Sequence, residues 1–191
     1  MATFDEVLEA IRSATSRSPR IVVGVSGYGG AGKSTLARRL LDEVPGSVRI
    51  RGDDFLHPEL TRERSADWAA FDRTRLRAEV LEPFRAGRPG TFRRLDWATG
   101  TLGPAEPLPA ASVLVVDAVG LFHHELDGLL DVRIWVDVDL DTATERGRAR
   151  DLRRGDADVT VWDDVWAPNE RDFAARHRPR ERADLRYDAS A

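Results

Sequence analysis

The sequence predicts an α/β fold with a mostly parallel, doubly wound, five-stranded sheet and helices on both faces. Short apolar runs typical of buried strands recur along the 191 residues, and segments with helical spacing of apolar residues separate them. A glycine-rich loop directly follows the first apolar run. The length suits one domain with a full core, so we expect residues 1–191 to form a single domain.

The glycine-rich loop has the pattern Gly-x4-Gly-Lys-Ser, and it lies between a predicted strand at 21–25 and a predicted helix from 36. Glycines let backbone N–H groups curve around a phosphate without Cβ clashes, and the helix N-terminus adds partial positive charge. Lys33 can reach the outer phosphates and the Ser34 hydroxyl can ligate Mg²⁺. This P-loop predicts binding of ATP and Mg²⁺ through Gly27, Gly29, Gly30, Ala31, Gly32, Lys33, Ser34 and Thr35.

The same loop also contains Gly-x-Gly-x-x-Gly, the dinucleotide-binding fingerprint. Asp53 and Asp54 follow at about the ~20-residue spacing of a ribose-binding acid, so a dinucleotide-binding oxidoreductase is an alternative. Lys33 argues against it, because it is the only lysine among 29 Lys and Arg residues. A compact ammonium group fits between phosphate oxygens where a planar guanidinium does not.

The remaining elements follow from apolar periodicity and turn residues. Helices are predicted at 4–16, after the P-loop to about 43, and at 72–85, 121–130, 139–154 and 163–178. Strands are predicted at 48–52, 113–116, 132–138 and 183–187. The segments 59–70 and 87–109 are irregular; Trp68 is expected to be a hydrophobic plug, whereas Trp97 either stacks on a base, covers a small substrate or plugs the core.

Three carboxylates follow predicted strands. Asp53 and Asp54 end the second strand, which we expect beside the P-loop strand, and one of them can accept a proton from an attacking hydroxyl. Asp-Asp is also good turn chemistry. Asp117 ends the strand at 113–116, where an acid holds Mg²⁺, usually through water; its alternative role is to cap the next turn.

Four arginines share one face of the helix predicted at 139–154. Arg146, Arg150, Arg153 and Arg154 have i, i+4, i+7 and i+8 spacing, and Glu145 and Asp151 lie off that face. Stacked like charges weaken a helix unless an anion joins them. We therefore predict an arginine-rich lid that closes on phosphates; the alternative is a solvated basic face.

The composition argues against several classes of protein. The net charge of -4 does not suit a nucleic-acid partner, and no apolar run approaches the ~18 residues of a membrane span. The N-terminal segment is amphipathic rather than a signal peptide, so we expect a cytoplasmic protein without a membrane partner. Asn169 is the only Asn and there is no Gln, which argues against a switch GTPase.

Metal sites other than the Mg²⁺ site are not expected. The chain has no Cys. His123 and His124 are adjacent and cannot share one face of the predicted helix, and the sequence lacks His-x3-His and His-Glu-x-x-His spacing, so a zinc site is not predicted.

Together these segments resemble the uridine kinase and phosphoribulokinase-like group of P-loop kinases, which also contains bacterial pantothenate kinase. The resemblance rests on residues 27–35, 53–58, 70–72, 95–97, 113–117, 146–151 and 183–185. It implies Asp53 as the catalytic base, Trp97 as the residue that stacks on a nucleoside base, and Asp67 or Asp72 as the ribose-binding acid. It also implies that the lid arginines contact phosphates.

Three positions depart from that group's pattern. Leu95 stands where nucleoside kinases usually have Tyr, and Gly100 stands about where uridine kinases carry a base-reading His. Asp117-Ala118 replaces the more usual Glu-Gly. These departures leave phosphoryl transfer intact but leave the acceptor open.

The sequence therefore predicts an ATP- and Mg²⁺-dependent kinase that phosphorylates a hydroxyl of a small molecule, a nucleoside being the leading acceptor. Lys33, Asp53, Arg150 and Arg153 are the predicted catalytic residues, Arg146 contacts the nucleotide, and Asp54 adjoins the acceptor. The alternatives are a non-catalytic or slowly hydrolysing ATP-binding module and, third, the oxidoreductase. The oligomeric state is not predicted.

Overall fold

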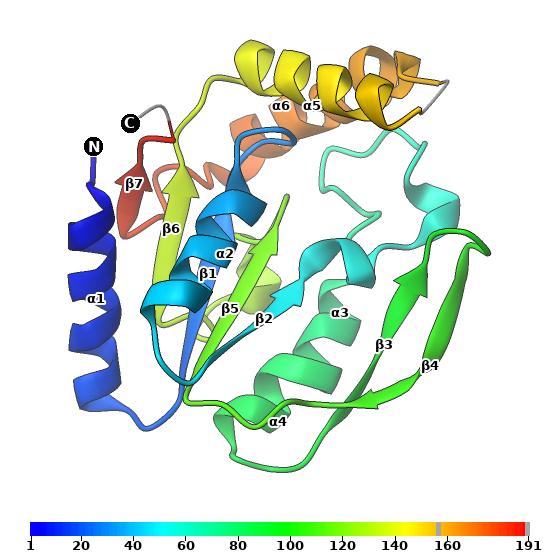
Figure 1. Cartoon of the computed structure of the whole chain (residues 1–191). Coiled ribbons are helices and arrows are strands. Elements are labelled where there is room, and N and C mark those ends of the chain that lie inside the picture. Colours follow the sequence, from blue (N-terminus) through cyan, green and yellow to red (C-terminus); the bar gives the residue numbers. More distant parts are fainter. Residues whose placement is uncertain (156–157, 190–191) are drawn as a thin grey trace.

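The computed structural model describes residues 1–155 and 158–189 (Figure 1). Within them, five parallel strands form one sheet in the order β2-β5-β1-β6-β7, which confirms the predicted fold class. The strands are β1 (Ile21–Ser26), β2 (Ser47–Arg51), β5 (Val113–Ala118), β6 (Val132–Val136) and β7 (Leu185–Tyr187). Every residue of β1 and β5 is buried, as expected for parallel strands covered on both faces.

The strand order decides between the two interpretations of the glycine-rich loop. In the dinucleotide-binding fold the first two strands of the chain are neighbours. Here β5 lies between β1 and β2, and Asp117 of β5 is in register with Val25 on one side and Arg51 on the other. The expectation that β2 would lie beside the P-loop strand was therefore wrong. Asp117, rather than Asp53, ends the strand adjacent to the P-loop strand.

Helices α1 (Phe4–Arg17) and α2 (Lys33–Glu43) cover one face of the sheet. Thr3 and Glu6 form a capping box that starts α1, and Val7, Leu8, Ile11 and Ala14 form its buried face. Helix α2 packs on β1, β2 and β5 and begins directly at the end of the P-loop. This arrangement points the N-terminus of α2 at the carboxyl edge of the sheet.

The other face is covered by a helical segment that Asp72 caps, as predicted. It comprises α3 (Arg73–Leu76), a π-turn (Arg77–Leu81) and α4 (Glu82–Arg85). Pro83, the second residue of α4, cannot donate a backbone hydrogen bond, so the regular helical ladder is interrupted there, next to the π-turn. Trp68 is buried in this second core, as expected of a hydrophobic plug, and it also borders the cavity at the carboxyl edge of the sheet.

Two further predictions were wrong. Residues 87–109 are not irregular throughout: β3 (Thr91–Asp96) and β4 (Thr101–Pro107) form an antiparallel hairpin, with Trp97 in its turn. Residues 121–130 contain only a 3₁₀ turn (His124–Leu126) instead of a helix. Gly120 precedes this segment and Gly128 lies within it, with φ of 70° and 77°, and this left-handed backbone interrupts helical geometry before and after the 3₁₀ turn.

Helices α5 (Leu140–Arg154) and α6 (Ala167–His177) lie across the carboxyl ends of the strands, at the top of Figure 1. Asp139 caps α5 by accepting the Thr142 N–H at 2.8 Å, and Gly155 ends it with φ of 90°. A π-turn (Trp162–Trp166) leads into α6. Within the described residues no helix is both long and apolar enough to span a membrane.

Candidate active site

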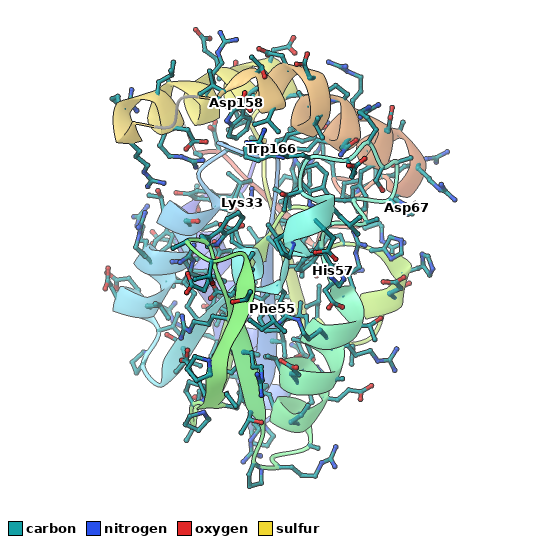
Figure 2. The ribbon with its side chains drawn as sticks, turned by 90° about the vertical axis from the view of Figure 1, so that its right-hand side faces the viewer. Lys33, Phe55, His57, Asp67, Asp158 and Trp166 are labelled. Carbon is teal, nitrogen blue, oxygen red and sulfur yellow. The ribbon has the colours of Figure 1, made fainter. Side chains whose placement is uncertain are left out.

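A cavity of about 850 Å³ opens at the carboxyl edge of the sheet. Its walls come from the P-loop, the turn after β2, the end of β5, the hairpin turn with Trp97, and helices α5 and α6. Figure 2 shows Lys33 beneath the layer formed by α5 and α6, with Trp166 above it. Ligands occupy this edge of open α/β sheets, so the cavity is the candidate active site.

The P-loop packs directly against the lid. Gly30 has φ of 84°, and a Cβ atom built there would lie 2.0 Å from the Ala143 carbonyl of α5. A Cβ atom on Gly147 of α5 would in turn lie 2.2 Å from the Trp162 ring. Only glycine permits both contacts, so α5 lies close above the phosphate loop.

Lys33 and Ser34 open α2 at the floor of the cavity. The Lys33 Nζ donates to the Tyr28 carbonyl at 2.7 Å. Desolvation lowers the pKa of Lys33, while Glu170, Asp53 and Asp117 act in the opposite direction. The Lys33 ammonium therefore lies among three acids at the floor of the cavity.

Asp117 of β5 joins two strands and a helix through its side chain. It accepts the Ser34 hydroxyl at 2.8 Å and a bidentate pair of hydrogen bonds from Arg49 of β2 at 2.6 and 2.7 Å. The Asp117 side chain is 4% exposed. The hydroxyl and carboxylate oxygens that favour Mg²⁺ therefore adjoin the phosphate loop, as the sequence indicated.

The adjacent acids Asp53 and Asp54 lie in a 3₁₀ turn (Gly52–Phe55), and their environments differ. The Asp53 side chain is 59% exposed and lines the cavity, whereas that of Asp54 is 4% exposed. Asp54 lies 3.4 Å from Arg94 of the hairpin, and burial raises its pKa. Asp54 is not among the described residues of the cavity lining, so its predicted place beside the acceptor does not match this geometry.

Three of the four lid arginines line the cavity: Arg146, Arg150 and Arg154. Arg153 is absent from the described part of the lining, which does not fit its predicted catalytic role. Asp151, which lies off the arginine face by helical spacing, binds Arg150 at 2.7 and 3.1 Å and accepts the Trp162 indole N–H at 3.0 Å. These contacts hold the Arg150 side chain.

The two acids predicted to bind ribose, Asp67 and Asp72, lie outside the described cavity lining. Asp67 contacts His177, and Asp72 caps α3 through the Arg75 N–H. Gly27 and Ala31 also lie outside it; Gly27 packs on β6 and Ala31 is in the core. Trp97 does line the cavity, and it is 54% exposed at the hairpin turn.

Sequence reasoning missed Glu170. This α6 residue is 3% exposed, and its carboxylate accepts the Gly29 N–H of the P-loop at 2.8 Å. Burial raises the pKa of Glu170 to about 7, although Lys33 and the Gly29 N–H lower it. The two partners are 141 residues apart, and no local pattern marks their contact.

The known proteins that resemble this chain are named as kinases. No family model matches the chain. It is 28% identical over 143 residues to a uridine kinase of Deinococcus deserti, covering 69% of each chain. It is 26% identical over 138 residues to uridine-cytidine kinase C of Dictyostelium discoideum, covering 69% of this chain but only 30% of that protein. A candidate fructose transport system kinase from Silicibacter sp. TM1040 has the same fold, with a TM-score of 0.79, 21% identity and coverage of 98% of this chain and 100% of that one.

The chain therefore resembles uridine kinases in sequence, and it shares the fold of the candidate fructose transport system kinase. In this uridine kinase-like chain, the departures at positions 95 and 100 are in the hairpin. Leu95 is 4% exposed and is part of the buried face of β3, whereas Gly100 adopts φ of 67° in the turn beside Trp97. The hairpin therefore offers the cavity one aromatic ring in its turn, with neither a Tyr at 95 nor a His at 100.

Proposed function

We propose that this chain transfers a phosphoryl group from Mg²⁺-bound ATP to a hydroxyl of a small molecule, with nucleosides as the leading acceptor class. The observation that carries the proposal is the convergence of four parts on one cavity: the P-loop, the Ser34–Asp117 pair, Asp53 and the lid arginines. Phosphoryl transfer requires mainly positioning and charge stabilisation, which this combination of groups supplies.

In this proposal each part of the cavity has a separate role. The P-loop N–H groups and the Lys33 ammonium bind phosphate oxygens. The Ser34 hydroxyl and the Asp117 carboxylate fit a Mg²⁺ ion, which when bound neutralises phosphate charge. The Asp53 carboxylate accepts the proton of the acceptor hydroxyl, and its exposure within the cavity leaves it accessible to that group.

The lid and the hairpin complete the site. The guanidinium groups of Arg146 and Arg150 bind phosphate oxygens of the transferred group. The Trp97 indole lies on the cavity wall, where its face can stack on a flat acceptor such as a nucleoside base.

The charge of the cavity favours a second acceptor class, small hydroxyl compounds that carry a carboxylate or phosphate. Among the described residues of the lining, seven side chains are cationic and three are acidic. ATP offsets this excess and Mg²⁺ restores part of it, so an anionic acceptor would bind in a favourable field. The cations are Lys33, Arg38, Arg49, Arg51, Arg146, Arg150 and Arg154, and the acids are Asp53, Asp117 and Glu170.

An ADP-release screen tests the proposal. Purified protein with ATP and Mg²⁺ is supplied in turn with nucleosides, neutral sugars, pantothenate and sugar phosphates. The proposal expects ADP to appear only with an acceptor, together with a phosphorylated product in mass spectra. Equal ADP production in every reaction, including the acceptor-free one, would instead identify a slow ATPase. ATP binding without turnover on any acceptor would indicate a non-catalytic module.

A further inference from the structure

Three of the chain's four histidines form a cluster outside the cavity lining described above. His123 and His124 precede and begin the 3₁₀ turn after β5, and His177 ends α6. The ring centroids of His123 and His124 are 4.0 Å apart, and those of His123 and His177 are 4.4 Å apart. The adjacent pair converges because this segment is a turn and not a helix, which removes the sequence-based argument against a site here.

We propose that His123, His124 and His177 bind a divalent transition-metal ion such as Zn²⁺. One potential ligand nitrogen from each ring lies within 4.8 Å of the others. Zn–N bonds of about 2.0–2.1 Å in a tetrahedral site place nitrogens roughly 3.4 Å apart, so rotations moving them by about 1 Å would suffice. Imidazole is a preferred ligand of zinc and its neighbours in the first row.

Two carboxylates flank the cluster. Asp67 lies 2.8 Å from His177 Nε2, the arrangement in which a carboxylate orients a metal-binding imidazole and leaves the other ring nitrogen for the ion. Glu125 Oε2 lies 3.7 Å from His123 Nδ1 and could complete the coordination. Among the described residues, His123 Nδ1 accepts the Glu125 N–H at 3.3 Å, a long bond that an ion at this nitrogen would replace.

The cluster runs from the interior to the surface. His123 is 4% exposed, whereas His124 is exposed. The Arg73 guanidinium opposes a cation, but Arg73 is itself held by the Gly120 and Asp67 carbonyls, and the Asp67 and Glu125 carboxylates offset its charge.

The ion would join three segments that are far apart in sequence: the loop containing Asp67, the turn after β5 and the end of α6. Helix α6 supplies Glu170 to the candidate active site, so the site would anchor the helix that closes the cavity. This inference does not depend on the proposed kinase activity. A bound ion would raise the melting temperature by mass action.

The test uses tag-free, chelator-stripped protein titrated with Zn²⁺ and with Co²⁺ in excess Mg²⁺, which occupies oxygen sites but competes poorly for imidazole. We expect one equivalent per chain, a Co²⁺ visible spectrum typical of nitrogen ligands, and a Zn²⁺-dependent rise in melting temperature. His124→Gln, at an exposed ligand, and His177→Gln should abolish these signals. Asp67→Asn should weaken binding by about 10–100-fold.

His57→Gln is the matched control, because it removes the one histidine outside the cluster. It should bind Zn²⁺ as the unmodified protein does. The proposal is overturned if the unmodified protein takes up no equivalent of Zn²⁺ under these conditions. It is equally overturned if His124→Gln, with an unchanged circular dichroism spectrum, binds as tightly as His57→Gln.

Discussion

The Ser34 hydroxyl donates a 2.8 Å hydrogen bond to the Asp117 carboxylate, which joins the first turn of α2 to the end of β5. Arg49 holds the same carboxylate from β2. The Arg49 guanidinium therefore binds the same carboxylate that is proposed to face Mg²⁺, so Arg49 and Mg²⁺ would compete for Asp117 in the proposed site.

Ser34→Ala should therefore raise the Mg²⁺ concentration needed for half-maximal turnover by about 10-fold or more, because one oxygen ligand is lost. Arg49→Met is the companion variant. It frees Asp117, so the Mg²⁺ requirement should stay the same or fall. Turnover measured against Mg²⁺ concentration checks both, and an unchanged curve for Ser34→Ala would contradict the assignment.

Lys33→Ala should lower turnover by at least about 100-fold without unfolding the protein, because a charge at the outer phosphates is removed. Lys33→Arg should also fail, since a planar guanidinium is too wide for the loop. ADP release and circular dichroism together check this. Near-normal activity of the arginine variant would refute the argument from the lone lysine.

Asp53→Asn should leave ATP affinity nearly unchanged and lower acceptor phosphorylation by roughly 10²–10⁴-fold, the usual contribution of a positioned base. Asp54→Asn is the matched control, because its side chain is buried against Arg94 and outside the described cavity lining. It should affect stability more than turnover. Loss of activity in Asp54→Asn with normal activity in Asp53→Asn would reverse the assignment.

Arg150→Ala should lower kcat more than it raises KM, if this group meets charge mainly in the transition state. We expect a loss of about 10²-fold or more. Arg153→Ala removes an equal charge from the same helix, but from a side chain that is not part of the described cavity lining, and should retain most activity. Equal kinetics for both variants would mean that the arginines form a solvated basic face and do not take part in catalysis.

Glu170→Gln tests the buried contact between α6 and the P-loop. The folded pKa of about 7 lies above the ordinary value of 4.5, so this group stabilises the fold fully below 4.5, and the contribution is lost as pH rises through 7. The variant should be more stable than the unmodified protein at pH 8, by about 1–3 kcal/mol, with little difference at pH 4.5. Urea unfolding at both values measures this.

Glu145→Gln is the control for that experiment, because Glu145 is an exposed residue of α5. The Glu145→Gln variant should not reproduce the gain in stability that is expected of Glu170→Gln at pH 8. A Glu170→Gln variant that is less stable than the unmodified protein at pH 8 would mean that the Glu170 carboxylate stabilises the fold in its charged form.

Local patterns were sufficient for the strand, loop and helix of residues 21–43, for the caps at Asp72 and Asp139, and for Asp117 beside Ser34. Turn chemistry, apolar spacing and capping act over a few residues, so their signals are contiguous in the chain. The prediction of a helix at 121–130 was wrong, because Gly120 and Gly128 adopt a left-handed backbone despite the apolar spacing of the segment.

Packing between distant segments determined the strand order and the contacts of the candidate site that the sequence did not predict. The position of β5 between β1 and β2, the contact of Glu170 with Gly29 and the approach of His177 to His123 each join segments far apart in sequence. The same holds for which lid arginines face the cavity, since helical spacing groups four of them but packing against Trp162 and Asp151 orients Arg150. Such contacts depend on how whole elements dock, and no local run of residues encodes that docking.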